Sequence, residues 1–169
     1  YYKNQIIYTV DDLIKEYDEL INKVVEAGLY AASGMNTQLG KIIVITNKEI
    51  RNKLSKLNAS IMNASIDPFY NAPVVLLVMV KKYRNAVIKP ERTPAIIAIY
   101  DGSCMIENML LEASSLGLGS CWIHRAKEEL ELEEGKEILS SLNINLDEYE
   151  GIGHVILGIP NQAYNEKSI

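Results

Sequence analysis

Residues 73–80 form an unbroken apolar run with the sequence PVVLLVMV. A strand with one face in water alternates apolar and polar side chains, whereas a strand buried on both faces shows no such alternation. We therefore expect residues 73–80 to form a central strand. Helices must then cover both faces of its sheet, which restricts the chain to an α/β or α+β sandwich.

Helical and strand patterns alternate on both sides of this run. Short apolar strands are predicted at residues 41–46, 120–124 and 153–159. Helices are predicted from Asp11 or Asp12 to Ala31, after a capping Asn47, and over residues 127–142 with Gly135 as a possible interruption.

The segment from residue 81 to residue 119 is harder to assign. Residues 81–94 are polar, basic and rich in helix breakers, so we expect a loop or lid. Residues 94–100 suit a strand by composition, and Asp101 resembles the N-cap of a helix that Gly117 and Gly119 end. Residues 98–116 are too apolar for a surface helix, which indicates burial in the fold or against a partner subunit.

Composition limits the class of protein. The chain of 169 residues is 48% hydrophobic, enough for a folded core, and its net charge of −5 argues against nucleic acid as a partner. Two cysteines are too few for a disulfide scaffold. No repeat, linker, signal peptide or membrane-spanning stretch is visible, so we expect one domain over residues 1–169 in a soluble, cytoplasmic protein that does not bind membranes.

Two loops are candidates for a ligand site. Residues 31–38 (AASGMNTQ) place short polar side chains beside the flexible Gly34, which suits either a polar ligand or a plain connection. Residues 117–124 (GLGSCWIH) suit either a ligand loop or a helix C-cap that leads into a strand. The G-x-G-x-x-G fingerprint of dinucleotide sites is absent.

Thiol and metal chemistry are weakly supported. Cys121 and His124 lie three residues apart on a predicted strand, so their side chains point to opposite faces and do not form a nucleophilic pair. His124, His154, Cys104 and Cys121 lack the usual spacing of metal ligands, and no metal is expected. His154 is interpreted as a strand histidine whose hydrogen bonds are satisfied.

Four collinear segments resemble the nitroreductase family of FMN enzymes. Residues 28–38 (GLYAASGMNTQ) resemble the family's A-P-S-x-x-N-x-Q loop, and residues 101–123 (DGSCMIENMLLEASSLGLGSCWI) its most specific block. Residues 67–73 (DPFYNAP) match as well, and residues 153–160 resemble the final G-Y-P strand. The resemblance implies an α+β fold: a three-layer α/β/α sandwich with a central, mainly antiparallel sheet, in an interlocked homodimer with two FMN sites at its interface.

The same resemblance implies which residues bind the cofactor. They are Ser33, Gly34, Met35, Asn36 and Gln38 in the first loop, Trp122, Ile123 and His124 along the flavin ring, and Lys167 near the phosphate. A backbone N–H at the end of the 120–124 strand would point at flavin N5. The chain departs from the family where it begins at Tyr1-Tyr2-Lys3, about where an R-R-S-x-R motif would end, and where Ile169 replaces an Arg.

The implied reaction is ping-pong. NADH or NADPH passes a hydride to FMN, and a small electron-poor acceptor (a nitroaromatic, a quinone or another flavin) then takes the electrons. No catalytic side chain is assigned. The alternatives are a relative with different flavin chemistry such as reductive dehalogenation, a non-catalytic flavin binder or carrier, and a thiol enzyme that uses Cys121.

Overall fold

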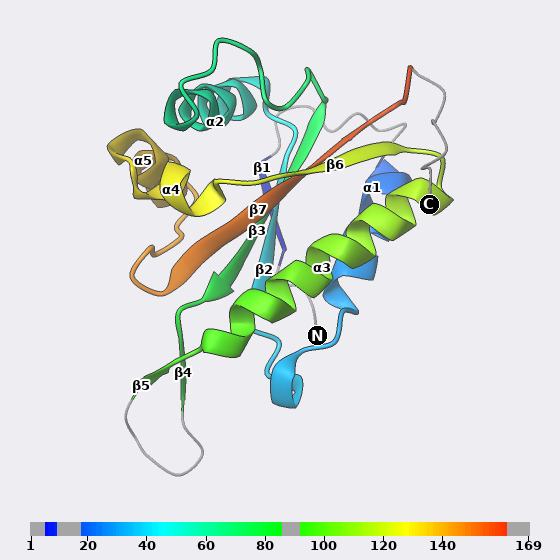
Figure 1. Cartoon of the computed structure of the whole chain (residues 1–169). Helices are drawn as coiled ribbons and strands as arrows, with labels where there is room; N and C mark the ends of the chain where they lie inside the picture. The colour runs from blue at the N-terminus through cyan, green and yellow to red at the C-terminus, as the bar shows by residue number, and fades with distance from the viewer. Residues whose placement is uncertain (1–5, 10–17, 86–91, 162–169) are drawn as a thin grey trace.

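One five-stranded sheet forms the centre of the molecule (Figure 1). The computed structural model describes residues 6–9, 18–85 and 92–161. The strands follow the order β1-β2-β3-β7-β6. Their bounds are β1 (Ile6–Thr9), β2 (Gly40–Ile45), β3 (Val74–Lys81), β6 (Gly119–Ile123) and β7 (Tyr149–Gly158). β1 pairs with β2 in parallel and the other neighbours pair antiparallel, which confirms a mainly antiparallel sheet.

Strand β3 is central and buried on both faces, as the apolar run predicts. Every residue from Val74 to Val80 is buried. Successive side chains enter two separate cores: Leu76 and Val78 contribute to one, whereas Val75 and Leu77 contribute to the other. A polar residue anywhere in this run would therefore face apolar side chains.

Helices cover both faces of the sheet (Figure 1). Helices α1 (Asp18–Leu29) and α3 (Ile96–Ser115) lie on one face, and α2 (Lys48–Ile61), α4 (Ala126–Glu131) and α5 (Glu133–Ser141) lie on the other. The three-layer α/β/α sandwich is thus confirmed. The side chain of Asn47 accepts a hydrogen bond from the Ile50 N–H at 3.0 Å, which confirms it as the cap of α2.

Helix α3 begins six residues earlier than the sequence predicts, because its N-cap is Ala95 rather than Asp101. Asp101 is therefore not an N-cap but lies inside the helix, where it is buried, and residues 96–100, which suit a strand by composition, are helical. The isoleucines that favour a strand by composition, Ile96, Ile97 and Ile99, are exposed on α3. The extended backbone lies before the helix. There β5 (Arg92–Pro94) pairs with β4 (Tyr83–Asn85) in a short antiparallel pair, within residues 81–94, which were predicted as a loop.

Gly117 ends α3, as predicted. Gly117 adopts φ 75°, and its N–H donates to the Ser114 carbonyl at 3.1 Å. The Leu118 N–H donates to the Ala113 carbonyl at 2.8 Å. This pair of bonds closes the helix in a Schellman motif, which favours glycine at the left-handed position. Gly119 does not end the helix but is the first residue of β6.

The predicted helix at residues 127–142 is two helices, and the break lies at Leu132 rather than at Gly135. Gly135 is buried because α5 folds back against α4: a side chain there would overlap the carbonyl oxygen of Glu129. The predicted start of the first helix, at Asp11 or Asp12, lies outside the described residues.

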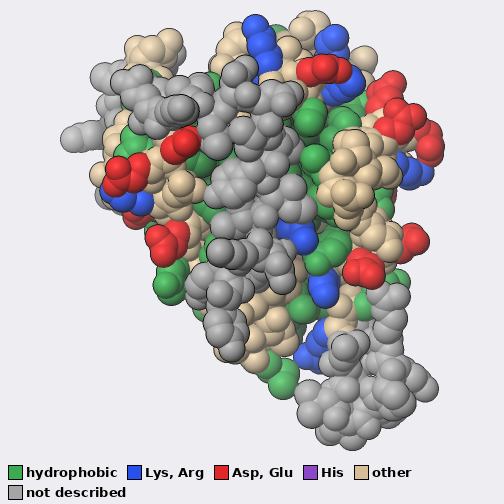
Figure 2. Space-filling view, turned by 180° about the vertical axis from the view of Figure 1, so that it is seen from behind, with side chains coloured by type: hydrophobic (Ala, Val, Ile, Leu, Met, Phe, Trp, Pro, Cys, Tyr) green, Lys and Arg blue, Asp and Glu red, His purple; other side chains and the backbone are tan. Residues whose placement is uncertain are grey.

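The side of the molecule that faces away from the viewer in Figure 1 carries charges of both signs. Figure 2 shows acidic side chains on both outer flanks of this face, with a short column of Lys and Arg side chains between them. The surface described there is mixed in charge, in keeping with a net charge of −5 for the whole sequence.

Candidate functional site

The first candidate loop is compact and internally hydrogen-bonded. It contains the short 3-10 helix η1 (Gly34–Asn36). The Gln38 N–H donates to Ser33 Oγ at 3.2 Å, and Thr37 Oγ1 donates to the Gly34 carbonyl at 2.9 Å. The loop therefore has a defined shape without a ligand.

The backbone of this loop is strained in a way that often marks ligand sites. Met35, Asn36 and Gln38 have φ of 54°, 54° and 49°, in the left-handed region that side chains other than glycine adopt at an energetic cost. The side chains of all three are exposed. The Met35 sulfur lies 3.6 Å from Arg84 Nη1 in β4, so the hairpin rests against the loop.

Asp101 anchors the loop to α3. Its Oδ1 accepts a hydrogen bond from the Gly34 N–H at 3.0 Å, and the residue is only 7% exposed. Gly34 approaches the helix closely, since a Cβ atom there would lie 2.6 Å from Ile97 Cγ2. The glycine thus allows close packing of the loop on α3. Sequence reasoning missed this anchor because the two residues are 67 positions apart.

The second candidate segment is the end of β6. Trp122 is 37% exposed, and its indole covers Gly153 of β7, where a side chain would overlap it. His124 is exposed, and Arg125 adopts φ 79° in the two-residue turn before α4. The His124 carbonyl accepts a hydrogen bond from Asn58 Nδ2 at 2.7 Å. This turn is therefore held from the core of the molecule.

Cys121 and His124 do not form a thiol–imidazole pair. Cys121 is exposed, and its thiol contacts the carbonyl of the adjacent Trp122 at 3.6 Å. Within residues 6–9, 18–85 and 92–161, no group of three or more His, Cys, Asp or Glu side chains could hold a metal ion.

The fold does not bring the two segments together in one chain. Gly40, directly after the first loop, pairs with Val80, whereas Trp122 pairs with Val155, which pairs with Leu76. This register places them about 13 Å apart along the strands and about 14 Å apart across three strand spacings, or about 20 Å in all. Lys167 lies outside the described residues.

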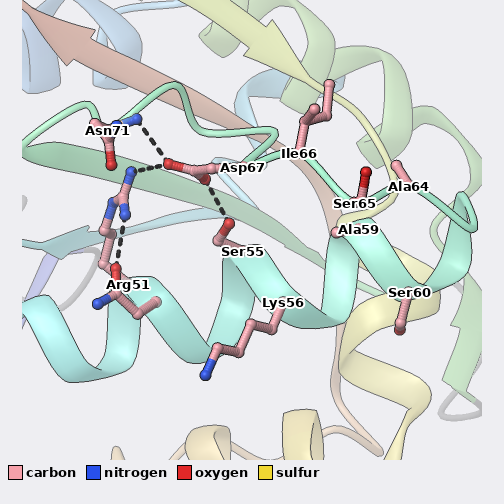
Figure 3. Close-up of a pocket in the computed structure, with 11 residues that line it drawn as sticks. Arg51, Ser55, Lys56, Ala59, Ser60, Ala64, Ser65, Ile66, Asp67 and Asn71 are labelled. Atoms are coloured by element: carbon pink, nitrogen blue, oxygen red, sulfur yellow. Dashed lines mark hydrogen bonds and ion pairs between the residues drawn. The ribbon is translucent and has the colours of Figure 1, made fainter.

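A groove of about 460 Å³ beside α2 has a structural explanation (Figure 3). Asp67 lies at its centre, where it pairs with Arg51 at 2.6 Å and accepts hydrogen bonds from Ser55 and from the Phe69 and Asn71 N–H groups. Burial alone would raise the pKa of Asp67, but these bonds outweigh it and lower the pKa to about 2. The groove therefore surrounds a carboxylate that ties the α2–β3 connection together.

The sheet and its two helical layers define an α+β sandwich with a polar loop at one end. The family model described as the Nitroreductase family matches residues 17–159, and the chain belongs to this family. Among the described helices, none is both long and apolar enough to cross a bilayer.

Curated relatives and solved structures agree with this family. An NADPH-flavin oxidoreductase of Vibrio harveyi is 30% identical over 111 residues, which are 63% of this chain and 44% of that protein. A protein of Archaeoglobus fulgidus, whose name includes NAD(P)H nitroreductase, is 29% identical over 122 residues, 72% of this chain and 64% of that protein. The chain thus spans less than two thirds of either curated relative.

The fold itself matches solved structures over most of the chain. A nitroreductase with bound FMN from Bacteroides fragilis superposes with a TM-score of 0.73 at 24% identity, over 90% of this chain and 83% of that chain. A second, also with bound FMN, from Desulfitobacterium hafniense gives 0.72 at 22% identity, over 90% and 82%.

Proposed function

We propose that the protein is an FMN-dependent oxidoreductase. It takes a hydride from NADH or NADPH and passes two electrons to a small electron-poor acceptor by a ping-pong reaction. The observation that carries this proposal is the family match over residues 17–159, which contains both candidate segments. Relatives named for flavin or NAD(P)H chemistry support it further.

The residues present fit such a cofactor. Bound FMN would supply the hydride-accepting centre, and the protein would supply orientation and polar contacts. Asn36 and Gln38 offer exposed amide side chains for the polar tail, and we propose that Ser33, Gly34 and Met35 complete this contact. Trp122 presents an indole with Ile123 and His124 beside it, which suits a flat aromatic ring. Lys167 is proposed for the phosphate.

We further propose that the protein works as a homodimer with the site between subunits. The two segments lie about 20 Å apart in one chain, and we propose that the loop of one subunit and the strand end of the other share the site. The surface of α3 supports this, because Ile97, Tyr100 and Leu111 are 49%, 66% and 62% exposed along one side of the helix. Such an apolar surface is typical of a protein interface.

One sheet contains strands that run from residue 6 to residue 158. Because β1 and β7 share that sheet, the sequence from its first strand to its last would not fold as separate pieces. This supports the proposal of a single domain.

Absorption spectroscopy tests the proposal. Protein purified without added cofactor should show flavin bands, and anaerobic NADPH or NADH should bleach them. Acceptor added afterwards should restore the bands, and initial rates should give parallel double-reciprocal lines, as a ping-pong reaction requires. Cys121→Ala should retain this activity, whereas a thiol enzyme would lose it.

Two outcomes would contradict the proposal. Flavin bands that neither nucleotide bleaches would indicate a flavin carrier rather than an enzyme. A colourless protein that also fails to bind added FMN would overturn flavin chemistry altogether.

A further inference from the structure

Three polar side chains form a cluster inside the core that α2, α4 and α5 share with the sheet. Asn58 of α2, Glu129 of α4 and His154 of β7 are each 0% exposed. Asn58 Nδ2 donates to Glu129 Oε1, and Glu129 Oε2 lies 3.2 Å from His154 Nε2. The His154 ring also packs on Phe69, with 5.0 Å between ring centres.

The cluster is a poor device for stability. Asn58 Oδ1, Glu129 Oε2 and both ring nitrogens of His154 are buried and make no hydrogen bond among the described residues, although Glu129 Oε2 and His154 Nε2 are within ion-pair distance. Buried polar atoms without partners destabilise a fold, and well-packed apolar replacements of buried polar networks are often neutral or stabilising. The sequence nevertheless keeps three polar side chains where the neighbours, such as Leu77 and Leu130, are apolar.

One contact of the cluster reaches outside it. The second hydrogen of the Asn58 amide is donated to the His124 carbonyl at 2.7 Å. His124 and Arg125 are the two residues between β6 and α4, and Arg125 has φ 79°. Asn58 therefore holds a backbone turn in a left-handed conformation that a non-glycine residue would otherwise tend to leave.

Peptide geometry gives this contact a direction. The His124 carbonyl and the Arg125 N–H belong to one planar trans peptide, so they point in opposite directions. The carbonyl is directed into the core toward Asn58, and the N–H is consequently directed away from α2 and the core. A hydrogen bond to the carbonyl thus fixes the direction of an outward-facing donor at the end of β6.

We propose that Asn58 is a positioning residue, held by Glu129 and His154, that presents the Arg125 backbone N–H to the ring of a bound flavin. The inference rests on the proposed function for the identity of the ligand. A donor preset in this way needs no rearrangement when negative charge develops on the ring, and so favours the reduced flavin over the oxidised one.

The test compares apolar replacement of the whole cluster with single changes. Asn58→Leu alone leaves Glu129 without its partner and is expected to unfold the protein. The triple variant Asn58→Leu/Glu129→Met/His154→Leu removes all three polar groups together. It should melt at the temperature of the wild type or above, yet the backbone N–H of residue 129, which donates to the Arg125 carbonyl at 3.0 Å, should exchange at least tenfold faster relative to its intrinsic rate.

The flavin supplies a second readout. The triple variant should bind reduced FMN tenfold less tightly relative to oxidised FMN, which is about a 30 mV lower two-electron midpoint potential. Glu129→Gln keeps an acceptor for the Asn58 amide and should leave exchange in the turn at the wild-type rate. Leu54→Ala is the matched control, because Leu54 is buried on α2 and belongs to the same core. It should lower the melting temperature without changing the midpoint potential.

Each other outcome counts against the inference. A triple variant that does not fold would show that the cluster is needed for stability, and one with wild-type exchange and potential would show that Asn58 does not position the turn. Wild-type protein that binds no FMN would overturn the proposed function and the flavin role of the turn. Hydrogen exchange in the apoprotein would still decide whether Asn58 holds the turn.

Discussion

Single residues in this protein take roles that depend on distant partners. Asp101 has the residue type and local setting of a helix cap, yet it is buried in the helix and accepts a hydrogen bond from Gly34. Asp67 has the setting of an ordinary turn residue, yet it binds Arg51, Ser55 and two backbone N–H groups. In both cases the carboxylate joins segments that sequence proximity does not connect.

Asp67 should make stability depend on pH. Its folded pKa of about 2 is below the value of about 3.9 expected in the unfolded chain. Its contribution is therefore fully present above about pH 4 and is lost as the pH falls through about 2. Because the side chain is 27% exposed and partly screened, we expect Asp67→Asn to lower the free energy of unfolding at pH 7 by about 1–2 kcal/mol.

Urea unfolding at pH 7 and near pH 2 measures this contribution. The difference between wild type and Asp67→Asn should shrink toward zero at the lower pH. Glu49→Gln is the control, because Glu49 pairs with Lys53 on the exposed side of α2 and its loss should change stability little. An Asp67→Asn difference that does not vary with pH would contradict the assignment.

At the scale of elements, tertiary packing decides where helices start and stop. Three isoleucines near the start of α3 have side chains that favour strands, but the segment is helical. Residues 127–142 have a helical pattern with a possible interruption at Gly135, but the chain breaks at Leu132 so that α5 packs against α4. These boundaries reflect contacts with other elements rather than local preference.

Gly135 provides the test for the α4–α5 packing. Gly135→Ala would gain up to about 1 kcal/mol of helix propensity on an exposed helix, but here its Cβ would overlap the Glu129 carbonyl. We expect a net loss of about 1–3 kcal/mol in the free energy of unfolding, because overpacking must move one helix. Glu134→Ala, on the exposed side of α5, should be neutral in the same chemical denaturation experiment. A Gly135→Ala variant as stable as wild type would show that α4 and α5 adjust freely.

At the scale of the whole molecule, one side of α3 carries exposed apolar side chains, with the exposed Cys104 and Glu107 among them. Tyr100 and Leu111 lie on the same side of the helix and are 66% and 62% exposed. If this side forms the dimer interface, Tyr100→Glu/Leu111→Glu should convert a dimer to a monomer of 18.9 kDa and release FMN. Sedimentation and the flavin spectrum would report both changes.

The control for this prediction places a charge on another exposed apolar side chain. Met62 follows α2 and is 56% exposed, so Met62→Glu should leave both the mass and the flavin content unchanged. A double variant with the mass of the wild type would show that α3 is not the interface. A monomeric wild type that retains FMN would contradict a site shared between subunits.

Local patterns were sufficient for several parts of this structure. The apolar run of β3, the Asn47 cap and the Gly117 helix end were all predictable, because each depends on residues within a few positions of one another. The layered sandwich follows from the first of these, since a strand buried on both faces needs two helical layers. The family motifs also indicated both candidate segments.

Other features required the tertiary structure. Two hydrogen bonds, Asp101–Gly34 and Asn58–His124, join residues that lie far apart in the sequence. The separation of about 20 Å between the two candidate segments likewise depends on the register of the sheet. No local periodicity encodes such contacts, because they depend on which helix faces which strand and in what register. The sequence by itself therefore determined the layers, the central strand and the family. Only the packing of those layers decided where the polar groups meet, and how far apart the two candidate segments lie in a single chain.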